Sequence, residues 1–176
     1  MILIAGLGNP EEKYNNTPHN IGFAVIDLFK EKFNFPEYSL FKNVLLSKKG
    51  NIILIKPQTY MNNSGTGVEQ VSSYFKIIPD NIWIIHDENR LNLGDFKINK
   101  DIPAFSHNGI KSIIEKLNSQ SFVRFRIGIN NGKEHNLADY VLKKFKKQDQ
   151  EIIDQTINKI ILLLDEAIQN GVEKII

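Results

Sequence analysis

The stretch that decides the fold is residues 1–10, which read Met-Ile-Leu-Ile-Ala-Gly-Leu-Gly-Asn-Pro. The first five residues are apolar, and the glycines, asparagine and proline that follow them are a turn signal. A short apolar run that ends in a turn is typical of a strand buried inside a sheet. The sequence therefore predicts that a buried strand over residues 1–5 leads into a tight turn.

Downstream of this strand, helical and strand-like patterns alternate. Thr17-Pro18 has the form of an N-cap followed by a first-turn proline, which predicts a helix that ends before Pro36. Further helices are expected over residues 65–76 and 108–117 and in the amphipathic tail around 153–168. Strands are expected over residues 40–47, 51–56, 81–85, 96–98 and 123–129, with a further short strand over 138–142. This order predicts an α/β fold, in which a single domain over residues 1–176 has a mixed twisted sheet flanked by helices on both faces.

Length and composition limit the class of protein. The 176 residues are 41% hydrophobic, which suits one domain with a sizeable core. Cysteine is absent, which excludes disulfides, a thiolate nucleophile and thiolate metal ligands, and fits a reducing compartment. No apolar run reaches the roughly 18–20 residues of a membrane span, and the N-terminus lacks the charged region of a signal peptide. We expect a cytoplasmic protein without a membrane partner.

The formal net charge of +2 hides an uneven distribution. Residues 96–147 contain eleven basic and four acidic residues, a net of +7, so the rest of the chain carries −5. Within this segment, residues 123–129 alternate apolar and basic side chains, as a half-exposed strand does. This excess of positive charge could simply be a solvent-exposed, lysine-rich surface on this half of the protein. It could also form a surface that follows nucleic-acid phosphates without reading sequence.

Polar residues gather where strands end and helices begin, which is where open α/β sheets bind ligands. These segments are Gly6-Leu7-Gly8-Asn9-Pro10 with His19-Asn20, Lys56 to Gly65, His86-Asp87, and Ser106-His107-Asn108-Gly109. Each residue also has a simpler interpretation, because asparagine suits turns and helix caps and a carboxylate can cap a loop. The two glycines alone are a weak nucleotide signal, since the third glycine of the dinucleotide fingerprint is missing.

Taken together, these motifs resemble the bacterial-type peptidyl-tRNA hydrolases, in the same order from residue 3 to about residue 145. The resemblance rests on Gly6-Leu7-Gly8-Asn9-Pro10, Tyr14, Thr17-x-His19-Asn20-x-Gly22, Lys56-Pro57-x-Thr59-Tyr60-Met61-Asn62-x-Ser64-Gly65, His86-Asp87-Glu88, His107-Asn108-Gly109 and Arg124-x-Arg126-Ile127-Gly128-Ile129. It implies a single α/β domain with a mixed twisted sheet. It also implies an enzyme that cleaves the ester joining a stalled peptide to the 3′-terminal ribose of tRNA.

The resemblance also implies roles for individual residues. His19 is expected to be the catalytic general base that activates water, and Asp87 to hold and stabilise its imidazole. The expected substrate-binding residues are Asn9 and Asn62 near the ester and oxyanion, Asn108 on the peptide backbone, and Tyr14 and Met61 as pocket walls. Such a mechanism needs no metal, no cofactor and no covalent intermediate.

The expected partner is tRNA, held through its acceptor and T arms by a monomeric protein. The expected phosphate contacts are Lys97, Lys100, Lys111, Arg124 and Arg126. Three places depart from the family pattern. Pro18 stands where an arginine is usual, residues 89–92 read Asn-Arg-Leu-Asn instead of Leu-Asp-Leu-Pro, and residues 101–106 replace a glycine-rich stretch.

Two alternatives remain open. A non-catalytic RNA-binding relative would keep the fold and lose turnover, although it has no need to retain both His19 and Asp87. An unrelated nucleotide-binding α/β protein is the other, but the chain lacks a P-loop lysine motif.

Overall fold

The seven strands of the described chain belong to one mixed sheet with the order β2-β3-β4-β1-β5-β7-β6. The computed structural model describes residues 1–133 and 136–176. The strands are β1 (Ile2–Gly6), β2 (Ser39–Phe41), β3 (Val44–Lys49), β4 (Ile52–Pro57), β5 (Ile82–Asn92), β6 (Phe96–Asn99) and β7 (Val123–Asn130). The central strands β4, β1, β5 and β7 are parallel, whereas β2, β3 and β6 add antiparallel edges.

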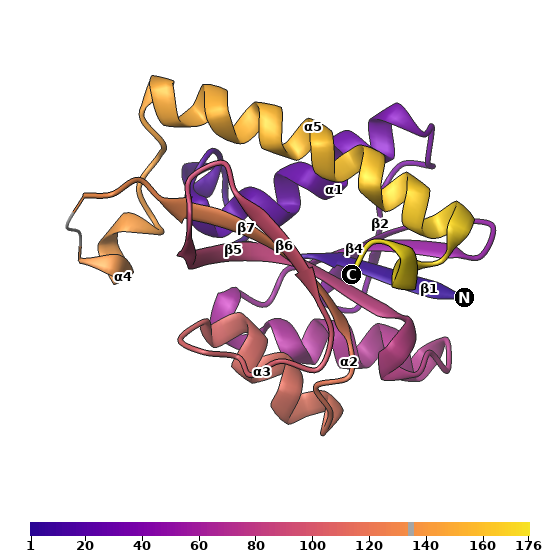
Figure 1. The fold of residues 1–176 in the computed structure, drawn as a ribbon. Helices are drawn as coiled ribbons and strands as arrows, with labels where there is room; N and C mark the ends of the chain where they lie inside the picture. Colours follow the sequence, from indigo (N-terminus) through magenta and orange to yellow (C-terminus); the bar gives the residue numbers. More distant parts are fainter. Residues whose placement is uncertain (134–135) are drawn as a thin grey trace.

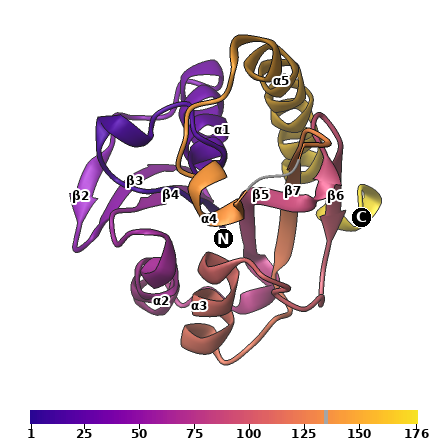
Figure 2. The ribbon, with the colours of Figure 1, turned by 90° about the vertical axis from the view of Figure 1, so that its left-hand side faces the viewer.

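Helices cover both faces of this sheet, as the sequence predicts (Figure 1). The helices α1 (Ile21–Lys32) and α5 (Lys147–Asn170) lie on one face, and α2 (Ser64–Tyr74) and α3 (Asn108–Leu117) lie on the other. Figure 2 looks onto the end of the sheet at which β7 stops, with the short helix α4 (Leu137–Tyr140) in front of it. The predicted α/β class is confirmed.

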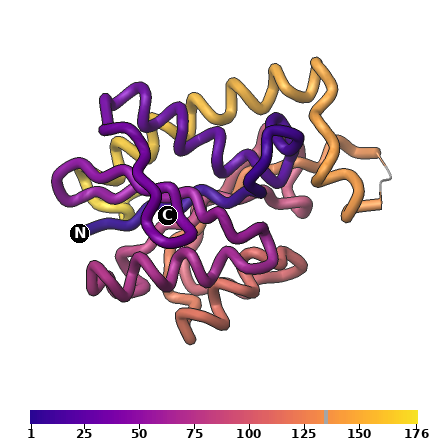
Figure 3. The backbone as a smooth tube through the Cα atoms, turned by 180° about the vertical axis from the view of Figure 1, so that it is seen from behind, coloured from indigo at the N-terminus to yellow at the C-terminus, as the bar shows by residue number. Residues whose placement is uncertain are grey.

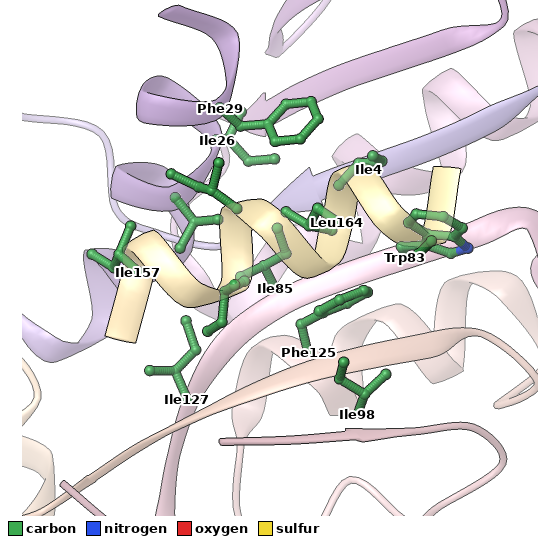
Figure 4. Packing of buried hydrophobic residues seen from close by; sticks show 14 of the residues in the cluster. Ile4, Ile26, Phe29, Trp83, Ile85, Ile98, Phe125, Ile127, Ile157 and Leu164 are labelled. Atoms are coloured by element: carbon green, nitrogen blue, oxygen red, sulfur yellow. The ribbon is translucent and has the colours of Figure 1, made fainter. Parts of the chain in front are cut away.

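The opening strand β1 is buried on both faces. Ile4 points into the core beneath α1 and α5, whereas Leu3 and Ala5 point into the core on the α2 and α3 side, and all three side chains are fully buried. Figure 4 shows Ile4 packed with Phe29 of α1 and Leu164 of α5. Such two-sided burial explains the unbroken apolar run, because a central parallel strand has no solvent face.

Two glycines bring the start of α1 against the sheet. A Cβ atom on Gly6 would lie 2.2 Å from the carbonyl oxygen of Gly22, and one on Gly22 would lie 2.4 Å from the carbonyl oxygen of Ile85. These contacts exclude any larger side chain. They fix the segment before α1, which carries His19, beside β1 and β5.

The structure corrects three of the element predictions. The segment 40–47 is two antiparallel strands, β2 and β3, separated by a turn in which Lys42 has φ of 52°. The strand predicted over 81–85 continues to Asn92, because β7 keeps pairing with it beyond Asp87. The strand expected over 138–142 is wrong, since these residues include most of α4, whose first turn is capped by the side chain of Asn136. The orange segment that contains α4 projects beyond the sheet when the molecule is seen from behind (Figure 3).

Candidate active site

The carboxyl ends of parallel strands meet at one edge of the sheet, and the candidate site lies there. β1 leads to Asn9, β4 leads to Met61, and Asp87 lies in β5 just past its pairing with β1. Two adjoining cavities of about 300 and 330 Å³ occupy this edge, and they share His19, Asn108, Ala138 and Val141 as lining residues. The seven residues proposed from the sequence line one or both cavities: Asn9, Tyr14, His19, Met61, Asn62, Asp87 and Asn108.

His19 lies in a 3₁₀ turn, Pro18–Asn20, directly before α1. Its backbone N–H donates to the carbonyl of Val141, 3.1 Å away, and so ties this turn to the end of α4. Its ring Nδ1 lies 3.0 Å from each carboxylate oxygen of Asp87. An ionised carboxylate only accepts hydrogen bonds, so Nδ1 carries a proton, and in the neutral imidazole Nε2 keeps a free lone pair.

The electrostatics of this pair favour a charged imidazole and a charged carboxylate. Burial lowers the pKa of His19, but the charge of Asp87 and its hydrogen bond outweigh burial and raise the pKa above its usual value of 6.5. Burial by itself raises the pKa of Asp87, but the two neighbouring imidazoles hold it well below its usual range. Asp87 is only 3% exposed and remains an acceptor of hydrogen bonds.

His107 is a second histidine on the same carboxylate. Its Nε2 lies 2.9 Å from Oδ1 of Asp87, and its Nδ1 accepts a hydrogen bond from the backbone N–H of Ile110 as the N-cap of α3. The accepted bond fixes the tautomer, so Nε2–H donates to Asp87. The sequence predicts no role for His107. Its place at a helix start next to Asn108, on the edge that carries Asp87, was the signal that could have identified it.

His86 is a third histidine near Asp87, and it contacts both the backbone of Asp87 and the ring of His107. It is fully buried, its Nδ1–H donates to the backbone carbonyl of Asp87 at 2.6 Å, and its ring meets that of His107 at 4.7 Å, close to edge-on. Burial lowers the pKa of His86 well below its usual value. His86 is therefore a neutral packing residue beneath the site.

Asn9 is oriented by hydrogen bonds on both its backbone and its side chain. Its backbone N–H and C=O pair with the side-chain amide of Asn20, at 2.9 and 3.0 Å. Its own Oδ1 accepts from the backbone N–H of Met61, 2.8 Å away. The Asn9 Nδ2 group consequently remains as a donor at the cavity wall, and the same bond places Met61 beside it.

Four other proposed residues complete the walls. Met61 is buried, and its sulfur packs where a Cβ atom on Gly109 would lie, so Gly109 cannot be enlarged without moving it. Asn62 and Asn108 are exposed. Tyr14 is half-buried and lines the same cavity as Asn9. Asn108 reaches both cavities because it begins α3 where they join.

A metal ion could use the same three central side chains. Ligand atoms of His19, Asp87 and His107 lie within 4.8 Å of one another, and two imidazoles with one carboxylate are a common donor set for zinc. In the structure the facing ring nitrogens instead donate hydrogen bonds to Asp87. A bound ion would have to displace both protons.

The structure corrects two of the predicted phosphate contacts. Arg124 is 1% exposed, and its guanidinium donates to the backbone carbonyls of Ile102 and Pro103. Arg126 is 8% exposed and forms an ion pair with Glu88 at 2.9 Å. Both lie beneath the segment 101–106, so their guanidinium groups are committed inside the protein and do not face an incoming phosphate.

The predicted lysine contacts lie at the surface. Lys97 and Lys111 are exposed, whereas Lys100 is partly buried and pairs with Asp80 at 2.5 Å. A further cavity of about 290 Å³ contains four lysines, Lys133, Lys143, Lys144 and Lys146, together with Asp139 and Asp149. It lies across α4 from the candidate site, because Ala138 and Val141 line the site while Asp139 and Tyr140 line this lysine cavity.

No helix in the described parts of the chain is long and apolar enough to cross a membrane.

Comparison with known proteins identifies the family. The family model described as peptidyl-tRNA hydrolase matches residues 3–176. A peptidyl-tRNA hydrolase of Clostridium botulinum is 42% identical to this chain, and the alignment covers all of this chain and 90% of that protein. A peptidyl-tRNA hydrolase of Mycoplasmopsis synoviae is also 42% identical, over 90% of this chain and 85% of that protein. The crystal structure of peptidyl-tRNA hydrolase from Acinetobacter baumannii superposes with a TM-score of 0.91 and 29% identity, over 99% of this chain and 91% of that one. The chain therefore belongs to the peptidyl-tRNA hydrolase family.

Proposed function

We propose that this chain hydrolyses the ester between a peptide, or an N-blocked amino acid, and the 3′-terminal ribose of tRNA, so that free tRNA is released. His19 acts as the general base and needs no metal. The observation that carries this proposal is the bond from Nδ1 of His19 to buried Asp87, which leaves Nε2 able to take a proton from water. Family membership supports the reaction class.

Proton transfer is the first chemical step. Nε2 of His19 removes a proton as water attacks the ester carbonyl, and the imidazolium that forms is stabilised by the charge of Asp87. When the tetrahedral intermediate collapses, the bond between the carbonyl carbon and the ribose oxygen breaks, and the imidazolium returns this proton to the leaving 3′ oxygen. His107 donates to Oδ1 of the Asp87 carboxylate, an oxygen that His19 also contacts, and so keeps this side chain in place while His19 changes charge. A base positioned in this way contributes about 10²–10⁴-fold to the rate.

Amide side chains then stabilise the negative oxygen. Asn9 presents its Nδ2 donor because its Oδ1 is occupied by Met61, and Asn62 lies at the same cavity. Donors fixed before the reaction stabilise the developing oxyanion more than mobile water does. Asn108 holds the peptide backbone in this proposal, a contact that does not depend on side-chain identity, and its position where the two cavities join supports this role.

The tRNA is proposed to lie across the exposed lysines, with its acceptor and T arms on one monomer. Lys97 and Lys111 and the lysine cavity beyond α4 support this path, because they extend positive charge on the protein surface. Contacts of this kind attract the phosphate backbone without selecting a sequence. Arg124 and Arg126 have no part in this surface.

The test is release of tRNA from N-blocked aminoacyl-tRNA by the wild type and by His19→Ala, each with and without EDTA. We expect the variant to be slower by about 10²–10⁴-fold at equal tRNA binding, and EDTA dialysis of the protein to leave the wild-type rate unchanged. Equal rates for wild type and variant, with tRNA still bound, would favour the non-catalytic RNA-binding alternative. Loss of activity with EDTA, restored by zinc, would replace metal-free chemistry with a metal at the His19–Asp87–His107 group.

A further inference from the structure

We propose that Arg90 and Phe105 form a substrate-binding pair at the rim of the active site, in which Phe105 holds the Arg90 guanidinium for a phosphate of the tRNA 3′ end. The inference rests on the proposed function and deepens it by assigning a contact for the single-stranded end. The phosphate meant is the one adjacent to the ribose that bears the ester.

The two side chains are already stacked. Cζ of Arg90 lies 4.0 Å from the centroid of the Phe105 ring, and Cζ of Arg126 lies 5.4 Å from the same centroid. Arg90 itself is exposed and Phe105 is 38% exposed, so the pair lies at the surface and not in the core. Stacking on an aromatic ring leaves the N–H edge of a guanidinium free to bind a phosphate, often through two hydrogen bonds.

In the part of the chain that the structure describes, the N–H edge of Arg90 has no protein partner. Within residues 1–133 and 136–176, no acceptor for the Arg90 guanidinium and no carboxylate paired with it is found. The bond that Arg90 makes to Glu88, at 3.0 Å, is donated by its backbone N–H. The other two arginines of the chain differ, because both are buried. The terminal nitrogens of Arg124 donate to backbone carbonyls, and those of Arg126 donate to Glu88 and Asn99. Arg90 is the arginine that remains for an external anion.

The local charge permits an anion to approach. Glu88 is the nearest carboxylate in sequence, but its Oε2 accepts two hydrogen bonds from Arg126, at 3.1 and 2.9 Å, and it is 6% exposed. Its negative charge is therefore compensated inside the protein. The exposed charge at this point of the rim is the positive charge of Arg90.

The pair is adjacent to the cavity that holds the catalytic histidine. Asn89, which precedes Arg90, and Ser106, which follows Phe105, line the same 300 Å³ cavity as His19 and Asp87. The phosphate of a terminal nucleotide is only one ribose away from its ester. A substrate with its ester at His19 therefore brings that phosphate to the rim of this cavity.

Both residues belong to the segments that depart from the family pattern. Arg90 occupies the aspartate position of Leu-Asp-Leu-Pro, and Phe105 lies in the stretch that replaces the glycine-rich segment. Phe105 adopts a φ of 50°, a left-handed conformation that is uncommon for an aromatic residue, and Arg124 holds the carbonyls of Ile102 and Pro103 just before it. The hydrogen bonds from Arg124 therefore hold residues 102–103 in place, next to the Phe105 ring that stacks on Arg90.

The experiment compares three substrates that carry the same N-blocked amino acid: full-length tRNA, the dinucleotide cytidylyl-adenosine with one phosphate, and adenosine with none. Arg90→Ala is expected to raise KM about tenfold for tRNA and for the dinucleotide, with kcat unchanged and no effect on the adenosine ester. Arg90→Lys is expected to raise KM for these two substrates less than Arg90→Ala does, because it keeps the positive charge. Phe105→Leu is expected to raise KM for the same substrates, also by less than Arg90→Ala. For tRNA, the slope of log KM against log salt concentration is expected to fall by about 0.7 in Arg90→Ala.

Lys48→Ala is the matched control, because it removes one exposed positive charge from β3, which lies near the edge of the sheet formed by β2 and three strands away from β5. The inference is overturned if Arg90→Ala impairs the adenosine ester equally, if it affects tRNA but not the dinucleotide, if it lowers kcat at constant KM, or if it behaves like Lys48→Ala. Failure of the proposed function gives a different result, since the wild type would then cleave none of the three esters.

Discussion

Replacing Asp87 by asparagine should invert the tautomer of His19, and the structure predicts how this can be partly reversed. Nδ1 of His107 accepts a hydrogen bond from Ile110, so its Nε2–H must donate to residue 87. In Asp87→Asn the amide oxygen would therefore take the Oδ1 position beside His107, and the amide N–H₂ would take the Oδ2 position, 3.0 Å from Nδ1 of His19, where it disfavours a proton on Nδ1. His19 would then carry its proton on Nε2 and could not act as a base.

The expected loss is large. The charge interaction across 3.0 Å is worth about 5.5 kcal/mol at an effective dielectric constant of about 20, before the cost of burial is subtracted. Because the reversed tautomer also removes the base itself, kcat should fall about 10³–10⁴-fold. His107→Ala alone leaves the carboxylate in place and should cost about tenfold, the value of one charge-assisted hydrogen bond.

The decisive variant combines both changes. Without His107, the amide of Asn at position 87 can turn its oxygen toward His19, so the double variant should be about tenfold faster than Asp87→Asn alone. Single-turnover release of tRNA at saturating enzyme measures this, with thermal unfolding as the check on folding and exposed Asp95→Asn as the matched control. A double variant that is as slow as Asp87→Asn, or slower, would refute the assignment of His107 as the residue that sets the orientation of this side chain.

Three further predictions follow from the geometry. The pKa of His19 lies above 6.5 and its neutral form is the active one, so kcat/KM should rise with pH through an apparent pKa above 6.5; a midpoint at or below that value would contradict the pairing. Gly22→Ala should lower the free energy of unfolding by about 1–3 kcal/mol, measured in denaturant, because its Cβ would lie 2.4 Å from a carbonyl oxygen of β5. Arg126→Met should destabilise the fold by about 3–5 kcal/mol by leaving buried Glu88 unpaired; unchanged stability with a higher KM for tRNA would instead restore the predicted phosphate contact.

Much of the fold could be predicted from local pattern. The apolar run before Gly6 specifies a central strand, and the stripe from Ile153 to Ile168 specifies the helix that covers it, since each period matches one kind of secondary structure. The predictions failed where length and pairing depend on a partner. β5 extends to Asn92 because β7 lies beside it, and residues 138–142 include most of α4 because nothing pairs with them as a strand.

The candidate site also has a part that the sequence predicts and a part that depends on tertiary contacts. The sequence alone placed His19, Asp87 and the asparagines at strand ends and helix starts, and parallel strands necessarily bring their carboxyl ends to one edge. It could not show that His107 shares the carboxylate of Asp87, because that contact depends on where α3 begins relative to β5.

The basic residues show most clearly what only the tertiary structure decided. Alternation in β7 indicates two faces, but whether a face meets solvent depends on what distant segments cover it. The segment 101–106 lies over Arg124 and Arg126 and turns an apparent phosphate surface into buried anchors for backbone and Glu88. By the same packing, Arg90 is left as the exposed arginine at the rim of the site. Sequence fixes which groups a strand or helix presents, whereas burial, partner and tautomer are set when segments far apart in the chain come into contact.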